Sequence, residues 1–97
     1  MKLNEQCMKE ILEYCINNIQ ITDEGKVHTF IRIFDIPKHF SNQYENSDVL
    51  YSIKKLIELN YIIISDLSAY DNKWHPGAFV YDVTYHGHKY LEGFDTN

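Results

Sequence analysis

Apolar residues recur at helical spacing along residues 1–18. Polar side chains fill the opposite face, and this pattern predicts an amphipathic helix. Asn17 and Asn18 are weak helix formers, so we expect the helix to end there and the chain to continue extended from Ile19. The predicted apolar stripe consists of Leu3, Cys7, Met8, Ile11, Tyr14 and Cys15.

A turn, a strand and a short helix are predicted next. Residues 23–26 (DEGK) are typical of a turn. Val27 to Ile36 is β-branched or aromatic almost throughout, which predicts a strand that ends at Pro37. The polar segment 37–47 carries two aromatic residues one helical turn apart, so we expect a short helix that begins at Pro37.

A second amphipathic helix is predicted from Ser47 or Asp48, either of which can cap it. Asn60 suits the left-handed conformation that closes a helix. The stripe that this helix would bury consists of Val49, Leu50, Ile53, Leu56 and Ile57.

A hairpin and a last helix complete the predicted order of elements. Residues 61–65 and 78–83 read as two strands joined by a loop over 66–77, and Thr84 can cap a short helix containing residues 86–91. This order predicts the α+β class, with a winged helix-turn-helix, a two-stranded wing and a short C-terminal helix. Residues 1–97 are expected to form a single domain.

Two stretches carry a resemblance to a known family. Leu50 to Ile62 (LYSIKKLIELNYI) is similar to a pattern in which a helix ends in a leucine-rich turn, a glycine and a strand, with Asn60 in place of the glycine. Val83 to Leu91 (VTYHGHKYL) resembles the close of the wing. Together they resemble a phage- and prophage-associated winged-helix family catalogued only as a domain of unknown function. The resemblance implies the fold and a mobile-element origin, and no catalytic residue.

Charge changes the picture of the partner. The chain has 14 Asp and Glu against 9 Lys and Arg, for a net charge of −5. Arg32 is its single arginine, although arginine makes the commonest specific contact to a guanine edge. The composition therefore argues against nucleic acid as strongly as the predicted fold argues for it.

Hydropathy and cysteine placement predict the compartment. No apolar run approaches the roughly 20 residues that a bilayer requires, and the N-terminus lacks a signal-peptide pattern. Cys7 and Cys15 lie too far apart along one helix to pair, so we expect reduced thiols in the core. These features predict a cytoplasmic protein without a membrane partner.

The candidate chemistry is sparse. A His-x-His pair at His86 and His88 can ligate zinc only with further ligands nearby, and no Cys-x-x-Cys or His-Glu-x-x-His accompanies it. The chain also lacks a nucleophile elbow and a phosphate-binding glycine loop. We therefore predict no enzyme activity, no metal and no cofactor.

Candidate binding residues follow from the way a winged helix docks. Its third helix, here the one predicted from Ser47 or Asp48, enters the major groove, and the wing tip touches the backbone or the minor groove. A hairpin would direct the Trp74 indole toward solvent, where it would anchor an interface; the alternative is that the indole folds back over the sheet. The alternative without a binding role is that Lys54 and Lys55 simply lie on the solvent-exposed face of an amphipathic helix. The predicted contact residues are Lys38, Tyr51, Ser52, Lys54, Lys55, Lys73, Trp74 and His75.

Two functions follow for such a chain. The primary prediction is a DNA-binding transcriptional regulator, with a homodimer as an open option. The alternative is a phage-encoded inhibitor or adaptor that offers an acidic, tyrosine-rich surface to a basic host protein, for example a defence nuclease such as a CRISPR effector. Eight tyrosines and a single arginine favour the alternative, whereas analogy of fold favours DNA.

Overall fold

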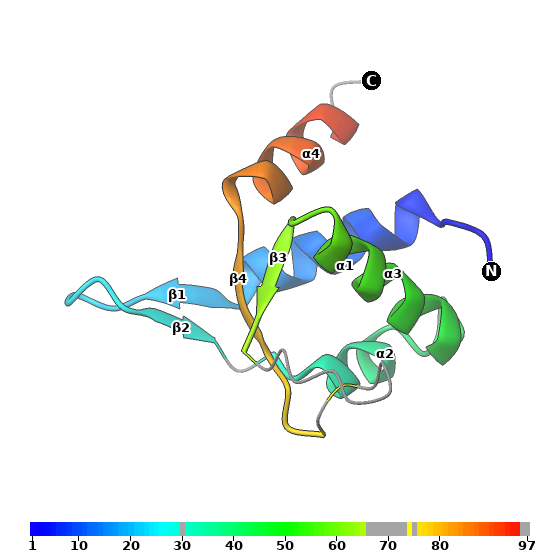
Figure 1. The fold of residues 1–97 in the computed structure, drawn as a ribbon, viewed down its shortest axis with the longest axis horizontal. Coiled ribbons are helices and arrows are strands. Elements are labelled where there is room, and N and C mark those ends of the chain that lie inside the picture. Colours follow the sequence, from blue (N-terminus) through cyan, green and yellow to red (C-terminus); the bar gives the residue numbers. More distant parts are fainter. Residues whose placement is uncertain (30, 66–73, 75, 96–97) are drawn as a thin grey trace.

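Figure 1 shows the arrangement of helices and strands in the computed structural model, which describes residues 1–29, 31–65, 74 and 76–95. The described residues belong to the α+β class, with four α-helices and two small antiparallel sheets of two strands each. The elements are α1 (Glu5–Asn17), β1 (Ile19–Ile21), β2 (Val27–Thr29), the 3₁₀ turn η1 (Ile33–Asp35), α2 (Ile36–His39), α3 (Asn46–Glu58), β3 (Ile62–Ile64), β4 (Val80–Val83) and α4 (Tyr85–Asp95).

Helix α1 confirms the first predicted element, with a later start. Asn4 caps it, because its side-chain oxygen accepts a hydrogen bond from the Cys7 backbone N–H at 3.0 Å. Leu3 therefore precedes the helix and is exposed, so its place in the predicted stripe is wrong. The residues of α1 that the fold buries are Cys7, Met8, Ile11, Leu12 and Cys15.

The predicted strand over residues 27–36 is wrong from Ile33 onward, and regular strand pairing with β1 ends at Thr29. Strand β2 ends there after pairing with β1, and the chain turns helical at Ile33. Ile33 and Ile36 are both fully buried and three positions apart, which is a helical spacing within a run that also suits a strand. Pro37 does not end a strand but lies in the first turn of α2, as expected for the short helix.

Helix α3 buries most of its predicted stripe, since Val49, Ile53 and Leu56 are inaccessible to solvent. Its predicted cap is wrong. Ser47 and Asp48 lie inside the helix, and the N-cap position belongs to Glu45, whose side chain makes no capping hydrogen bond. The predicted left-handed residue is confirmed, because Asn60 has φ of 59°.

The hairpin of β3 and β4 is confirmed, with strands shorter than predicted. Ile62 pairs with Val83 and Ile64 with Val80 in antiparallel register. A third segment joins this pair at its far edge, where the Val80 N–H donates to the Ile31 carbonyl at 2.8 Å. Among the residues that connect the two strands, 66–73 and 75 lie outside the described ones.

Helix α4 is tied to this hairpin by Thr84 and Gly87. The Thr84 hydroxyl donates to the Asn60 carbonyl at 2.6 Å and accepts from the Gly87 N–H at 3.0 Å, which confirms its predicted capping role. A Cβ at position 87 would lie 2.4 Å from the Tyr61 carbonyl oxygen. Only glycine allows the helix to approach so closely.

One core joins α1, α3 and the two strands β3 and β4. Cys7 and Cys15 are both buried within it as free thiols, as predicted. Burial raises the pKa of Cys15 to about 12 and also raises that of Cys7. Neither thiol is therefore a nucleophile at neutral pH.

The hydrophobic length of the helices bears on the membrane prediction. Among the described residues, none of the helices has the length and apolar character needed to cross a bilayer.

Candidate functional site

Three of the predicted contact residues line one groove. Tyr51 and Lys54 come from α3, and Trp74 reaches the groove from the connection between β3 and β4. The groove has a volume of about 300 Å³, and its remaining lining residues are Met1, Ser47 and Leu50. We call this feature the α3–Trp74 groove. Lys73 and His75 lie outside the described residues.

The Trp74 side chain does not project into solvent as predicted. Its indole is partly buried, packs against the core and meets the Phe34 ring edge-on, with ring centroids 6.2 Å apart. The sequence shows a tryptophan in a polar loop, whereas Phe34 reaches it from a distant turn. Trp74 consequently lines the groove and also packs against the hydrophobic core.

The lysines among the predicted contact residues differ in whether a carboxylate pairs with them. Lys55 bonds to Glu58 at 2.9 Å, which raises the pKa of the lysine, and its ammonium also lies 5.0 Å from the centre of the Tyr51 ring. Lys38 is exposed and pairs with Asp35 at 3.5 Å. Within the described part of the chain, Lys54 is exposed and makes no ion pair, so it is the one predicted lysine with an uncompensated charge.

Ser52 is misplaced in the predicted set. Only 1% of its surface is exposed, and its hydroxyl donates to the Asp48 carbonyl at 2.8 Å inside α3. The side chain lies near Cys7 of α1, where it partly offsets the rise that burial causes in the pKa of that thiol. A small hydroxyl that bonds back to its own helix is compatible with burial, and so Ser52 packs two helices together instead of facing a partner.

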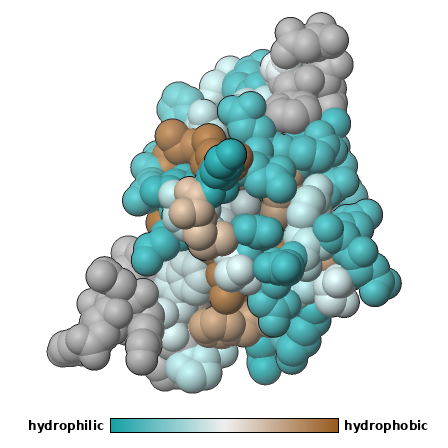
Figure 2. Space-filling view, turned by 90° about the vertical axis from the view of Figure 1, so that its right-hand side faces the viewer, coloured by the Kyte–Doolittle hydropathy of each residue, from teal (hydrophilic) through white to brown (hydrophobic). Residues whose placement is uncertain are grey.

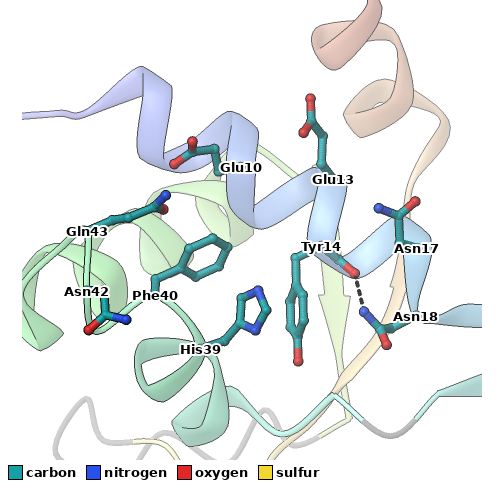
Figure 3. Close-up of a pocket in the computed structure, with 9 residues that line it drawn as sticks. All are labelled: Glu10, Glu13, Tyr14, Asn17, Asn18, His39, Phe40, Asn42 and Gln43. Carbon is teal, nitrogen blue, oxygen red and sulfur yellow. Dashed lines mark hydrogen bonds between the residues drawn. The ribbon is translucent and has the colours of Figure 1, made fainter.

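A second concave region lies between α1 and the segment that begins with α2 (Figure 3). Its volume is about 670 Å³. Tyr14 and His39 stack there with ring centroids 4.3 Å apart and an interplanar angle of 25°. We call it the Tyr14–His39 pocket. The pocket could not be found from the sequence, because Tyr14 follows the spacing of the predicted core stripe and His39 comes from a distant element.

The described residues offer little support for metal chemistry. They contain no group of three or more His, Cys, Asp and Glu side chains placed to hold an ion. His86 and His88 are exposed on α4, and His39 is engaged in the stack with Tyr14.

Comparisons of the chain with protein-family models, with curated proteins and with solved structures found no match. The resemblance to the phage winged-helix family therefore stays a prediction. The structure does explain the stretch from Val83 to Leu91 in physical terms. Thr84 and Gly87 hold α4 against the hairpin, and Tyr90 stacks on Tyr61 with ring centroids 4.9 Å apart.

Proposed function

We propose that the chain is a winged-helix binding module, without enzymatic activity, whose partner is a protein. Support for the winged-helix assignment comes from the element order and from the pairing of three segments. Helix α2 packs on α3, β3 and β4 follow as a hairpin, and the bridge between Arg32 and Phe79 adds the segment after β2 to the same sheet. In a winged helix, too, a pair of helices precedes the hairpin; the β1–β2 hairpin between α1 and α2 is additional to that order.

The lining of the α3–Trp74 groove is the observation that favours a protein partner over DNA. In a DNA-binding winged helix, this helix would present cations to the phosphates. Here Glu58 compensates Lys55, and apolar surface from Leu50, Tyr51 and Trp74 lies where a groove of DNA would need polar contacts. An apolar groove of this size suits one large side chain of a protein.

Surface character supports the same choice. Figure 2 views the molecule from the side on which the N-terminus lies, and hydrophilic residues cover most of that face, with hydrophobic ones in separate patches. A partner would therefore gain affinity from an anchor in a groove and from charge, not from a broad apolar contact. Because the chain carries a net charge of −5, a basic protein is the complementary partner.

A peptide selection tests the proposal. A random peptide library displayed on yeast would be selected on the immobilised chain, and the enriched peptides measured by fluorescence anisotropy. We expect peptides that combine an aromatic or aliphatic anchor with Arg or Lys. Tyr51→Ser and Trp74→Ala should each weaken binding more than about tenfold, whereas Lys38→Ala, at an exposed site on α2, should not. Circular dichroism would verify that the variants fold. The proposal would be contradicted if the selected peptides bound Tyr51→Ser and Trp74→Ala as tightly as the original chain.

DNA binding is the second candidate, and the uncompensated charge of Lys54 favours it. The matching measurement uses labelled duplex DNA of random sequence over a range of salt concentrations. The regulator would be established instead by saturable binding for which Lys54→Ala lowers the slope of log affinity against log salt concentration by about one, the value expected for one lost phosphate contact. We expect no saturable binding at physiological ionic strength.

A further inference from the structure

The β1–β2 hairpin has one apolar face and one polar face. Ile21 pairs with Val27 in the antiparallel register, and Ile19 lies two positions before Ile21. Because side chains of alternate residues point to the same face of a strand, these three aliphatic side chains share one face. The residues between them, Gln20 and His28, point to the other face and line a different small hollow.

The apolar face of the hairpin lines a groove of about 280 Å³. Strand β4 and helix α4 supply the other side of this groove, and Figure 1 shows the hairpin projecting beside them. Ile21, close to the turn, is 69% exposed. We call this feature the β1–β2 groove. Its lining residues are Ile16, Ile19, Ile21, Val27, Asp82 and His88.

Asp82 is the single carboxylate among the residues that line this groove. Its Oδ1 accepts a hydrogen bond from the Val83 backbone N–H at 2.8 Å. Within the described part of the chain, Asp82 forms no ion pair, and its Oδ2 accepts no hydrogen bond. One oxygen of the carboxylate is therefore left for a cation from outside the molecule.

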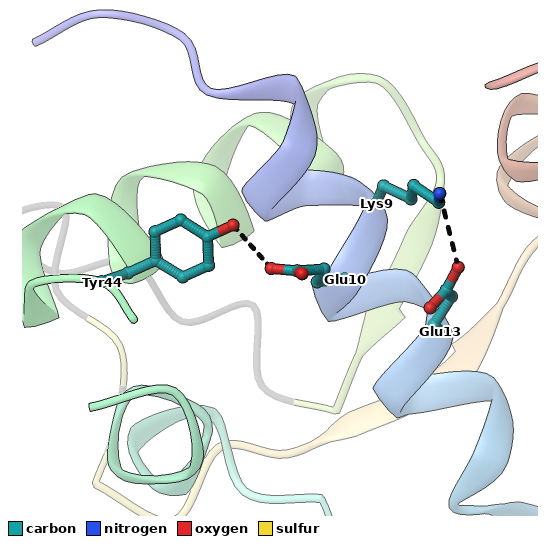
Figure 4. A network of polar contacts seen from close by, with 4 residues as sticks. All are labelled: Lys9, Glu10, Glu13 and Tyr44. Atoms are coloured by element: carbon teal, nitrogen blue, oxygen red, sulfur yellow. Dashed lines mark hydrogen bonds and ion pairs between the residues drawn. The ribbon is translucent and has the colours of Figure 1, made fainter. Parts of the chain in front are cut away.

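The carboxylates of the Tyr14–His39 pocket differ from Asp82, because protein groups already engage them. Glu10 accepts a hydrogen bond from the Tyr44 hydroxyl at 2.5 Å, and Glu13 lies 4.0 Å from the Lys9 ammonium (Figure 4). In the β1–β2 groove, by contrast, a carboxylate without an ion pair lies beside aliphatic surface.

These features suit a lysine side chain better than other side chains. Lysine has a four-carbon stem that packs on aliphatic surface and an ammonium that acts as a point charge. Arginine gains most from a carboxylate that accepts with both oxygens, whereas here the Val83 N–H occupies one of them. It also gains from stacking, and the His88 imidazole is the only ring among the lining residues. An uncharged aliphatic side chain would leave the carboxylate without a cation.

We propose that the β1–β2 groove binds a lysine side chain of the protein partner, with the stem against Ile19, Ile21 and Val27 and the ammonium at Oδ2 of Asp82. The protein origin of this lysine rests on the proposed function, in which the net charge of −5 favours a basic partner. The recognition chemistry rests on the groove alone. The groove shares no lining residue with the α3–Trp74 groove, so each site can be tested by itself.

Nuclear magnetic resonance on the isotope-labelled full chain tests the groove directly. The probe is the peptide acetyl-Gly-Gly-Lys-Gly-Gly-amide, compared with counterparts that carry Nε-acetyl-lysine or arginine at the central position. Acetylation keeps the stem and removes the charge, whereas arginine keeps the charge and changes the head group. We expect saturable shifts at the amides of residues that line the groove, with affinity about threefold or more above that of either counterpart.

Two variants and two matched controls locate the site. Asp82→Asn removes the charge and keeps an oxygen for the Val83 N–H, and Glu24→Gln removes the same charge from the tip of the hairpin, where the side chain is 79% exposed. Ile21→Thr alters the apolar face of β1, and Gln20→Thr places the same residue on its polar face. We expect Asp82→Asn and Ile21→Thr each to weaken the lysine peptide about threefold or more, and both controls to leave its affinity unchanged.

Several outcomes would overturn the inference. Equal affinity for the three peptides, equal effects of Asp82→Asn and Glu24→Gln, or shifts spread over the whole acidic surface would each show a nonspecific attraction. The two proposals can fail separately. Selected peptides that need Trp74, together with a lysine peptide that does not bind the β1–β2 groove, would overturn this inference alone. Lysine binding in the groove together with a failed peptide selection would overturn the proposed function alone.

Discussion

The chain contains two antiparallel hairpins that differ in almost everything except their pairing. The β1–β2 hairpin projects from the body of the molecule and has no fully buried residue, with Ile21 69% exposed (Figure 1). The β3–β4 hairpin instead buries Ile62 and Ile64 from one strand and Val80 and Val83 from the other in the core. Strand pairing alone thus says little about stability, since an isolated hairpin is marginal in water.

The difference comes from the neighbours of each hairpin. Helix α4 clamps β3 and β4 through Thr84 and Gly87, and the segment around Ile31 bonds to the outer side of β4. The β1–β2 turn is closed mainly by its own residues, as the Thr22 N–H donates to the Lys26 carbonyl at 2.9 Å. We therefore expect the two hairpins to respond very differently to substitution.

The largest expected effect is that of Gly87→Ala. The new methyl group would meet the Tyr61 carbonyl oxygen at 2.4 Å and a Val83 methyl at 2.9 Å, so α4 must move away from the β3–β4 hairpin. We expect a loss of about 1–3 kcal/mol in the free energy of unfolding, measured by urea denaturation.

Gly93→Ala is the matched control in the same helix, because nothing lies within 4 Å of a Cβ at that position. It should stabilise the chain by about 0.5–1 kcal/mol through helix propensity. Similar changes at both glycines would mean that α4 does not clamp the hairpin.

An intermediate effect is expected for Thr84→Val, which keeps the shape of the side chain and removes its hydroxyl. The Asn60 carbonyl and the Gly87 N–H would both lose a hydrogen-bond partner. The expected loss is about 1–2 kcal/mol in thermal or chemical unfolding, and Thr84→Ser should recover most of it. A valine variant as stable as the original chain would show that packing, not the hydroxyl, holds the clamp.

The smallest effect is expected for Ile21→Thr in the β1–β2 hairpin. The side chain is mostly exposed and threonine also favours strands, so the free energy of unfolding should change by less than about 0.5 kcal/mol. Hydrogen exchange would extend the test, with amides of β1 and β2 exchanging faster than those of β3 and β4. Equal protection in the two hairpins would contradict the comparison.

The contrast also explains what the sequence could predict. Helices α1 and α3, the β3–β4 hairpin and the capping by Thr84 were predictable, because periodic apolar residues and a capping residue are local signals. The helical turn at Ile33 was not, since a short β-branched run suits both a strand and a buried helix. The helical turn places both Ile33 and Ile36 in the shared core, and this burial depends on residues far away in the sequence.

The sites divide in the same way. The sequence placed Tyr51 and Lys54 on one face of a helix, and the structure keeps them together in the α3–Trp74 groove. It could not place Trp74 against Phe34 or His39 against Tyr14, because both contacts join residues from different elements. It also misplaced Ser52, since helical spacing alone did not reveal that α1 covers that position of α3.

The bridge between Arg32 and Phe79 has a consequence for how the chain folds. Both hairpins pair nearby segments, but this bridge closes a loop that contains the whole of α3. The entropy lost in closing such a loop must be offset before the contact forms, so helix docking is expected to precede it. Substitutions that weaken the bridge should then leave the folding rate nearly unchanged and speed unfolding, so the bridge lengthens the kinetic lifetime of the fold.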